Sequence, residues 1–224
     1  MIFSADDDTG PSERLLDVAL EAAAHARTIS LRDLSARLGG EPAWPEIWPG
    51  EHYRLLAGLV RTVKPRTVVE IGTATGLSAL AMYGQLPSEG RIVTFDLIPW
   101  VQYPGAVLSQ DDFADGRLTQ ELHDFSTQQP GVHAELLETA DLIFIDAAKD
   151  GRQERRFLRL LETTPLRRDP IVIFDDIRVW NMLEIWREVR RPKLDITSFG
   201  HWSGTGLVDF AGPAARPAGA PGAG

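Results

Sequence analysis

The sequence predicts an α/β domain built on a mostly parallel sheet with helices on both faces. From residue 67 onward, short β-rich runs alternate with amphipathic helical patterns, an order of elements that produces a parallel sheet. Residues 143–145 and 171–174 are apolar throughout, as expected of strands that are covered on both sides. The chain has 224 residues, which is enough for one sizeable domain.

Three helices are expected before the sheet begins. Residues 13–27 carry polar side chains at helical spacing, and Ser12 stands where a helix cap is favourable. A second, short helix begins near Asp33, and a third ends before Pro65, because proline cannot continue a helix. We expect residues 1–65 to form a helical cap or lid that belongs to the same domain as the sheet.

The remaining elements follow in alternation. Strands are predicted at residues 67–71, 91–96, 117–122, 141–146 and 170–175. Helices are predicted at residues 77–86, about 127–138, 152–163 and 179–190. Two later runs, at about 193–198 and 205–210, have no helix between them and predict a closing hairpin. We expect the sheet-bearing domain to span residues 66–211, and the Gly-, Ala- and Pro-rich residues 212–224 to be disordered.

Composition disfavours several classes of protein. The formal charge of −9 argues against sequence-independent binding of nucleic acid, which needs a strongly basic surface. The chain has no cysteine, so disulfides, thiolate chemistry and cysteine-ligated zinc are excluded. The first residues lack the apolar core of a signal peptide, and no apolar run approaches the ~20 residues that span a bilayer. We therefore expect a cytoplasmic protein that binds neither nucleic acid nor membranes.

The most informative segment is the turn after the first predicted strand. An apolar run reaches a carboxylate at Glu70 and then turns through Gly72 and Gly76 into an alanine-rich helical pattern. Glycines allow a ligand to approach the backbone, and the start of a helix offers unpaired N–H groups. The turn is therefore a candidate ligand-binding loop.

Acidic residues stand at the ends of four predicted strands. Glu70 and Asp96 end the first and second strands, Asp146 ends the fourth, and Asp175–Asp176 end the fifth. In an open parallel sheet, ligands bind outside the carboxyl ends of the strands. Because a buried carboxylate is costly without a partner, we expect each acid to serve a hydroxyl, a cation or a hydrogen-bond network in one shared crevice.

The glycine spacing favours one kind of ligand. Asp96 lies 20 residues after Gly76, a placement that suits an acid binding ribose hydroxyls. The pattern from Gly72 to Gly76 is G-x-x-x-G and lacks the central glycine that admits a pyrophosphate. S-adenosylmethionine has a ribose and no phosphate, and its cationic groups suit a carboxylate at Glu70.

These segments resemble class I S-adenosylmethionine-dependent methyltransferases, and most closely the small metal-dependent O-methyltransferases of the catechol and caffeoyl-CoA type. The resemblance covers roughly residues 48–210. Residues 69–78 (VEIGTATGLS) resemble the first motif of that family, residues 141–149 (DLIFIDAAK) its metal-and-lysine motif, and residues 173–176 (IFDD) the strand that supplies two more ligands. The family has a Rossmann-like, seven-stranded, mostly parallel sheet of order 3-2-1-4-5-7-6 with its last-formed strand antiparallel, which agrees with the predicted hairpin.

The resemblance implies roles for individual residues. Contacts with S-adenosylmethionine would be made by Glu70, Gly72, Thr73, Ala74, Gly76, Ser78, Asp96 and Asp146, and Asp124 is a candidate for the adenine amino group. A divalent cation, with magnesium as first candidate, would be held by Asp146, Asp175 and Asp176, since oxygen ligands suit a hard cation. The cation would chelate two vicinal substrate oxygens and lower the pKa of one hydroxyl. Lys149 would act beside that hydroxyl as base or electrostatic partner.

Several of these residues keep a second interpretation. The family usually has Asn where this chain has Asp176, and a third full charge would crowd the site, although Asp and Asn ligate similarly through one oxygen. Asp175 and Asp176 could instead cap the following helix, and Asp124 could cap another. Lys149 could be a solvated lysine. His201, in a His-Trp-Ser-Gly turn, is either a general base or substrate contact or a solvated turn residue.

The leading functional prediction is an O-methyltransferase that acts on a small hydroxylated molecule, with catechols as one candidate class, assisted by a divalent cation. One alternative is a metal-independent methyltransferase with His201 or Lys149 as base. A nicotinamide dehydrogenase is disfavoured by the missing central glycine. A non-catalytic methyltransferase-like binding protein is disfavoured by the intact cofactor loop. Because dimers are frequent in the family, a homodimer is also an expectation.

Overall fold

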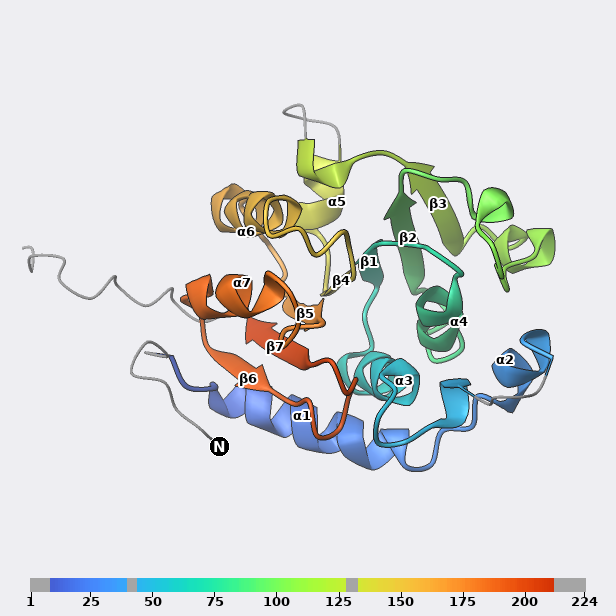
Figure 1. Ribbon diagram of the computed structural model, residues 1–224, viewed down its shortest axis with the longest axis horizontal. Coiled ribbons are helices and arrows are strands. Elements are labelled where there is room, and N and C mark those ends of the chain that lie inside the picture. Colours follow the sequence, from blue (N-terminus) through green and yellow to red (C-terminus); the bar gives the residue numbers. More distant parts are fainter. Residues whose placement is uncertain (1–8, 40–43, 128–132, 212–224) are drawn as a thin grey trace, which may run out of the picture.

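The computed structural model describes residues 9–39, 44–127 and 133–211 (Figure 1). The disorder expected for residues 212–224 falls outside these ranges. Three helices precede the sheet, as predicted: α1 (Glu13–Ala26), α2 (Arg32–Arg37) and α3 (Tyr53–Val63). The Ser12 side chain caps α1 by accepting a hydrogen bond from the Leu15 backbone N–H at 3.1 Å.

Seven strands form one sheet of order β3-β2-β1-β4-β5-β7-β6, as predicted. They are β1 (Thr67–Ile71), β2 (Arg91–Asp96), β3 (Leu118–Leu122), β4 (Leu142–Ile145), β5 (Ile171–Asp175), β6 (Lys193–Asp195) and β7 (Thr205–Asp209). The first five strands pair in parallel, whereas β7 runs antiparallel to both β5 and β6. The predicted hairpin is therefore confirmed.

Two apolar layers sandwich the sheet, because successive side chains of a strand point to opposite faces. On one face, Val69 and Ile143 pack with α5 (Ala134–Glu138), α6 (Gln153–Thr163) and α7 (Met182–Glu188). On the other, Val68 and Leu142 pack with α1, α3 and α4 (Leu77–Tyr83). Figure 1 shows these two groups of helices on opposite sides of the strands. The N-terminal helices α1 and α3 thus share a hydrophobic core with the sheet.

Three helices are shorter than the sequence predicts, and each has a local reason. Helix α4 ends at Tyr83 with Gly84 as its C-cap, and the chain then turns toward Pro87. Helix α5 begins only after His133, whose φ of 63° is incompatible with a right-handed helix. Helix α7 begins after Trp180, which has a φ of 47°, and ends where Val189 becomes extended. The hydrophobic pattern of a sequence does not indicate where such changes in φ end a helix.

A backbone contact joins two segments that are distant in the sequence. Gly50, before α3, forms a β-bridge with His201, in the loop between β6 and β7. The Trp202 N–H also donates to the Gly50 carbonyl at 3.1 Å. The segment before α3 is thereby tied to the end of the sheet at which β5 terminates. Within the described ranges, no helix combines the length and apolarity needed to cross a bilayer.

Candidate functional site

The turn between β1 and α4 is held by backbone hydrogen bonds. The Gly72 N–H donates to the Phe95 carbonyl at 2.8 Å, and the Gly76 N–H donates to the Thr73 carbonyl at the same distance. Ala74 has a φ of 44° and Gly76, the N-cap of α4, a φ of 84°. The turn therefore presents its backbone at the start of a helix, as a ligand loop requires.

Both glycines of the turn are required by close packing. A Cβ atom on Gly72 would lie 1.9 Å from the Asp146 carbonyl oxygen, and one on Gly76 would lie 2.3 Å from the Leu108 side chain. The sequence interpretation assigned these glycines to the approach of a ligand. The structure adds a second cause, because Gly72 allows the β1 turn to touch the loop after β4.

Glu70 is a buried carboxylate at the end of β1 and is 0% exposed. Within the described chain no hydrogen bond reaches either carboxylate oxygen. Burial raises the pKa of Glu70 to about 7, and the nearby hydroxyls of Ser78 and Thr94 partly offset this shift. Thr94 instead shares a hydrogen bond of 2.8 Å with Thr73. A buried carboxylate without a partner beside a ligand loop is suited to receive a cationic group.

Asp96 connects the ends of β1 and β2. Its Oδ2 accepts a hydrogen bond from the Ala74 N–H at 2.9 Å, and its Oδ1 accepts from Leu97 at 2.7 Å and from Ile98 at 3.2 Å. Oδ2, which accepts a single hydrogen bond, keeps a second lone pair for a ligand hydroxyl. Asp96 thus lies beside the turn, where the sequence interpretation expected a ribose-binding acid.

Asp124 follows β3 and acts as a local cap. Its Oδ1 accepts hydrogen bonds from the Ser126 N–H at 2.9 Å and from the Ser126 hydroxyl at 2.6 Å. Burial opposes ionisation of Asp124, but these hydrogen bonds hold its pKa below the ordinary value. The capping alternative for Asp124 is therefore realised, and a contact with adenine stays a prediction.

Three carboxylates converge after β4 and β5. Ligand atoms of Asp146, Asp175 and Asp176 all lie within 4.8 Å of one another. The donors are all oxygen, so they fit a hard divalent cation. Helix α7 has Asn181 as its N-cap, so neither Asp175 nor Asp176 occupies that cap position.

The Lys149 ammonium lies inside this acidic cluster. Its Nζ is 2.5 Å from Asp146 Oδ1 and 2.5 Å from Asp176 Oδ2. Burial alone would lower the pKa of Lys149, but Asp146 and Asp176 raise it above its ordinary value. The Lys149 backbone is fixed by Glu154, which is fully buried and accepts from the Lys149 N–H at 2.6 Å. Lys149 is therefore a charged member of the site rather than a solvated lysine.

Two histidines approach the buried face of Asp175. Its Oδ1 lies 3.3 Å from His52 Nδ1 and 3.4 Å from His201 Nδ1. Burial would raise the pKa of Asp175, yet the two histidines hold it well below its usual range. Burial would lower the pKa of His52, but Asp175 raises it. His201 belongs to this network, while its side chain stays 19% exposed.

From the sequence, His52 had little weight as a functional residue, and its neighbour Glu51 had no assigned role. His52 lies just before α3, and no residue near it in the sequence indicates a chemical partner. The structure buries both residues and places Glu51 Oε2 3.5 Å from His201 Nε2. The bridge between Gly50 and His201 brings them together, and sequence patterns give no sign of this long-range contact.

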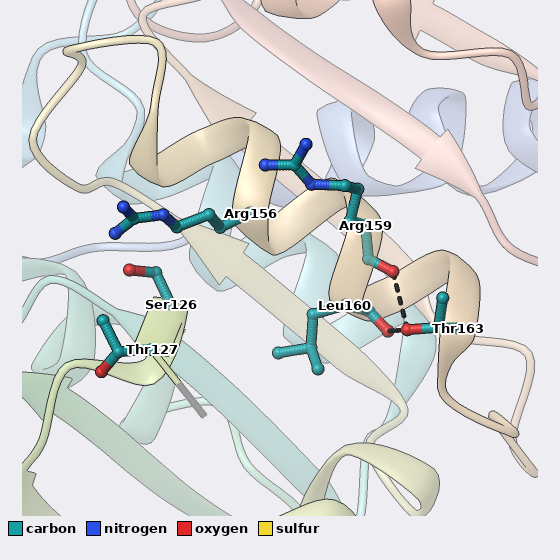
Figure 2. A pocket seen from close by; sticks show the side chains of 6 residues that line it. All are labelled: Ser126, Thr127, Arg156, Arg159, Leu160 and Thr163. Carbon is teal, nitrogen blue, oxygen red and sulfur yellow. Dashed lines mark hydrogen bonds between the residues drawn. The ribbon is translucent and has the colours of Figure 1, made fainter. Parts of the chain in front are cut away.

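An open hollow of about 420 Å³ lies elsewhere on the surface (Figure 2). It is lined by residues 126 and 127 and by Arg156, Arg159, Leu160 and Thr163 of α6. In Figure 2 the two arginines extend from α6, while Ser126 and Thr127 come from the short segment after β3. None of the acids that end β1, β2, β4 or β5 lines this hollow.

Comparisons with known proteins agree with the fold. Residues 69–177 match the family model Methyltransf_24, described as a methyltransferase domain. Catechol O-methyltransferase domain-containing protein 1 of Mus musculus is 37% identical over 68 residues, which are 30% of this chain. That match spans only 26% of the length of the mouse protein.

Two solved structures share the fold at low sequence identity. A methyltransferase from Geobacter sulfurreducens superposes with a TM-score of 0.56 at 17% identity, over 81% of this chain and 90% of that one. The O-methyltransferase TomG from Streptomyces achromogenes, which is involved in tomaymycin synthesis and was solved with S-adenosylmethionine, gives a TM-score of 0.51 at 18% identity, over 88% and 90% of the two chains.

The sheet order and the motif-bearing turn define the class of protein: this is the fold of class I S-adenosylmethionine-dependent methyltransferases. Residues 69–177, which match the methyltransferase domain model, contain the β1 turn and the acids that follow β4 and β5.

Proposed function

We propose that the protein transfers a methyl group from S-adenosylmethionine to a hydroxyl of a small molecule, with catechols as the leading candidate class. The observation that carries the proposal is the contact between Gly72 and the Asp146 carbonyl. This contact sets the backbone of the turn between β1 and α4 beside the cluster of Asp146, Lys149 and Asp176. A methyl donor in the turn would therefore lie next to groups that can activate a hydroxyl.

The cofactor would be held by the turn and by the acids beside it. The cationic methionine end would meet Glu70, near Ser78 and the backbone of Gly72 to Gly76. The ribose hydroxyls would meet Asp96, whose carboxylate is already fixed by the Ala74 N–H. The adenine would extend toward Asp124. These contacts would orient the sulfonium methyl toward the end of β4, so orientation would supply much of the rate.

A divalent cation fits the oxygen atoms of Asp146, Asp175 and Asp176. When bound, such an ion polarises a substrate hydroxyl and lowers its pKa. The chain itself contributes the Lys149 ammonium, which would stabilise the developing oxyanion by charge. Because its pKa is raised, Lys149 keeps its proton and is poorly suited to act as base.

His201 is the better candidate for the base. Its ring is partly exposed, and Asp175 and Asp176 lie 3.4 Å and 3.6 Å from its Nδ1. In the chemical step, the substrate hydroxyl would lose its proton to His201 and the oxygen would attack the sulfonium methyl. The new C–O bond forms as the C–S bond breaks, and S-adenosylhomocysteine leaves with the electron pair on sulfur.

A metal-independent version of this reaction is the second candidate. It is favoured by the position of Lys149 Nζ between two carboxylates, because an ammonium there supplies the positive charge that a metal would otherwise bring. The two versions share the cofactor, the acceptor hydroxyl and the base, and they differ only in their need for a divalent ion.

Calorimetry and turnover test the proposal together. S-adenosylmethionine is titrated into the protein, and methylation of a catechol and of a matched monohydric phenol is then measured with Mg²⁺ or with EDTA. The proposal expects cofactor binding, preference for the catechol and loss of turnover with EDTA. Turnover that resists the chelator selects the metal-independent version. No binding of S-adenosylmethionine, with NAD⁺ as the comparison ligand, overturns both.

A further inference from the structure

We infer that His52, His201 and Asp175 form a binding site for a borderline divalent cation of the Zn²⁺ class. The site lies beside the cluster of Asp146, Asp175 and Asp176 and shares only Asp175 with it. It goes beyond the proposed function, in which the cation has oxygen ligands alone and His201 acts as the base. A metal ion on His201 Nδ1 would take the lone pair that the base needs, so His201 fills one of these two roles at a time. Metal binding at this site does not depend on methyl transfer.

The distances suit a single ion. His52 Nδ1 and His201 Nδ1 lie 3.3 Å and 3.4 Å from Asp175 Oδ1, and the three ligand atoms are all within 4.8 Å of one another. A tetrahedral ion with bonds of about 2.1 Å holds its ligand atoms about 3.4 Å apart. The three side chains are therefore already near the positions that an ion would impose.

Two of the ligand atoms are buried and lack hydrogen bonds. His52 is 4% exposed and Asp175 is 2% exposed. In the part of the chain that the structure describes, neither His52 Nδ1 nor Asp175 Oδ1 has a hydrogen-bond partner of good geometry. Buried polar atoms are nearly always satisfied, so two unsatisfied atoms that lie 3.3 Å apart indicate a missing ligand.

Neighbouring side chains also orient the two histidine rings. His201 Nε2 faces Glu51 Oε2 at 3.5 Å, the arrangement in which a carboxylate fixes the tautomer of a metal-bound imidazole. This leaves the lone pair of His201 on Nδ1, where the Ser203 hydroxyl lies at 2.8 Å and can rotate away. His52 packs edge-on against Phe144, with ring centroids 5.6 Å apart, which holds its ring in place.

The site differs in chemistry from the neighbouring acidic cluster. The Lys149 ammonium already lies between Asp146 and Asp176, whereas Asp175 Oδ1 points to the histidines. Imidazole ligands favour Zn²⁺, Co²⁺ and related ions over Mg²⁺. Three protein ligands leave a fourth position open, and the partial exposure of His201 leaves that position reachable for an oxygen atom of a small molecule.

Metal titration of the full chain tests the inference without any turnover. The protein is treated with EDTA, dialysed and titrated with Co²⁺ while visible absorption is followed; Zn²⁺ and Mg²⁺ are then compared by calorimetry. We expect one Co²⁺ ion to bind per chain, with an absorption spectrum typical of nitrogen ligation. Zn²⁺ should displace this Co²⁺, whereas Mg²⁺ at the same concentration should not. We expect His52→Gln and His201→Gln each to weaken binding roughly 10-fold or more.

Matched variants separate this site from others. Asp146→Asn removes a ligand of the acidic cluster only and should keep Co²⁺ binding, whereas Asp175→Asn should lose it. The double variant of His123→Asn and His133→Asn, whose rings lie 5.2 Å apart, controls for another histidine pair and should bind normally. Melting curves show whether each variant folds. If His52→Gln does not fold, His201→Gln still tests the inference, because His201 is partly exposed and its substitution should disturb the fold less.

Three results would overturn the inference. They are an affinity for Zn²⁺ no greater than that for Mg²⁺, normal Co²⁺ binding by His201→Gln, and loss of Co²⁺ binding in Asp146→Asn equal to that in Asp175→Asn. Binding of S-adenosylmethionine is measured on the same samples. If S-adenosylmethionine does not bind, the proposed function is wrong, and the Co²⁺ and Zn²⁺ titrations still decide whether the metal site exists.

Discussion

Gly72 and Asp146 touch through their backbones, and a Cβ atom on Gly72 would lie 1.9 Å from the Asp146 carbonyl oxygen. The contact joins the turn after β1 to the loop after β4, which carries Lys149. Residues that are far apart in the sequence thereby become one site, and this contact is the first target for mutation.

Gly72→Ala should destabilise the fold and abolish binding of S-adenosylmethionine. The new methyl group meets a backbone atom that cannot give way, and φ at this position is +104°. We expect a loss of more than about 3 kcal/mol of unfolding free energy, from overpacking and backbone strain together. Urea denaturation and calorimetry measure the two effects.

Gly105→Ala is the matched control for this substitution. Gly105 has a φ of +75° and nothing within 4 Å of its Cβ position, so the variant carries the strain without the clash. Its cost should be about 1 kcal/mol, with cofactor binding retained. Equal losses in the two variants would show that strain alone accounts for the effect and that the contact with Asp146 is unimportant.

The affinity for S-adenosylmethionine should depend on the ionisation of Glu70. Burial raises the pKa of this carboxyl to about 7, so below that pH the protein without ligand holds a neutral Glu70. Binding a cationic ligand then requires release of a proton, and affinity should fall about tenfold for each pH unit below 7. Calorimetry from pH 5.5 to about 8 in buffers of different ionisation enthalpy measures the proton released. An affinity that is flat over this range, as expected for Glu70→Gln, would contradict a role for the charge.

Glu70→Gln should stabilise the protein in the absence of ligand at pH 8. The folded state raises the pKa of Glu70 from 4.5 to about 7, so the folded protein binds more protons and its stability falls as pH rises between these values. At about 1.4 kcal/mol for each pKa unit, removing the charge should add up to about 3 kcal/mol at pH 8 and little near pH 4.5. Denaturation midpoints at the two pH values provide the measurement. A variant less stable than the parent at pH 8 would mean that the Glu70 carboxylate has a favourable partner in the free protein.

Lys149→Met should raise the affinity for Mg²⁺ while lowering turnover. The ammonium lies 2.5 Å from carboxylate oxygens of Asp146 and Asp176, so it competes with a metal for the same atoms. Loss of its charge beside the developing oxyanion should reduce kcat by roughly 100-fold or more. Calorimetry with Mg²⁺ and methyl-transfer kinetics measure the two effects.

Lys64→Met supplies the control for Lys149→Met. Lys64 has a φ of 50°, close to the 59° of Lys149, and is exposed at the end of α3. The control should leave both Mg²⁺ affinity and turnover unchanged. Unaltered Mg²⁺ binding in Lys149→Met would argue that the acidic cluster does not hold the metal.

The sheet could be predicted from the sequence because its strands carry their own signals. Runs such as residues 171–174 are apolar at every position, and the acids that follow them mark where the strands end. Helix lengths were less predictable. His133 and Trp180 have positive φ values inside the ranges predicted as helix, and neither residue type signals such a conformation in the sequence.

The acids at the strand ends could likewise be predicted from the sequence, whereas the pairing of His52 with Asp175 could not. Glu70, Asp96 and Asp146 could be placed because each ends a strand of a parallel sheet. The position of His52 against Asp175 depends on the bridge from Gly50 to the loop after β6, which no local pattern encodes.

A crystal structure with S-adenosylmethionine or S-adenosylhomocysteine would show where the cofactor binds. We expect the ligand along Gly72 to Gly76, with its ribose hydroxyls in hydrogen-bond reach of Asp96 and its ammonium beside Glu70. A ligand bound elsewhere, for example in the hollow between Arg156 and Arg159, with the β1 turn left uncontacted, would contradict this expectation.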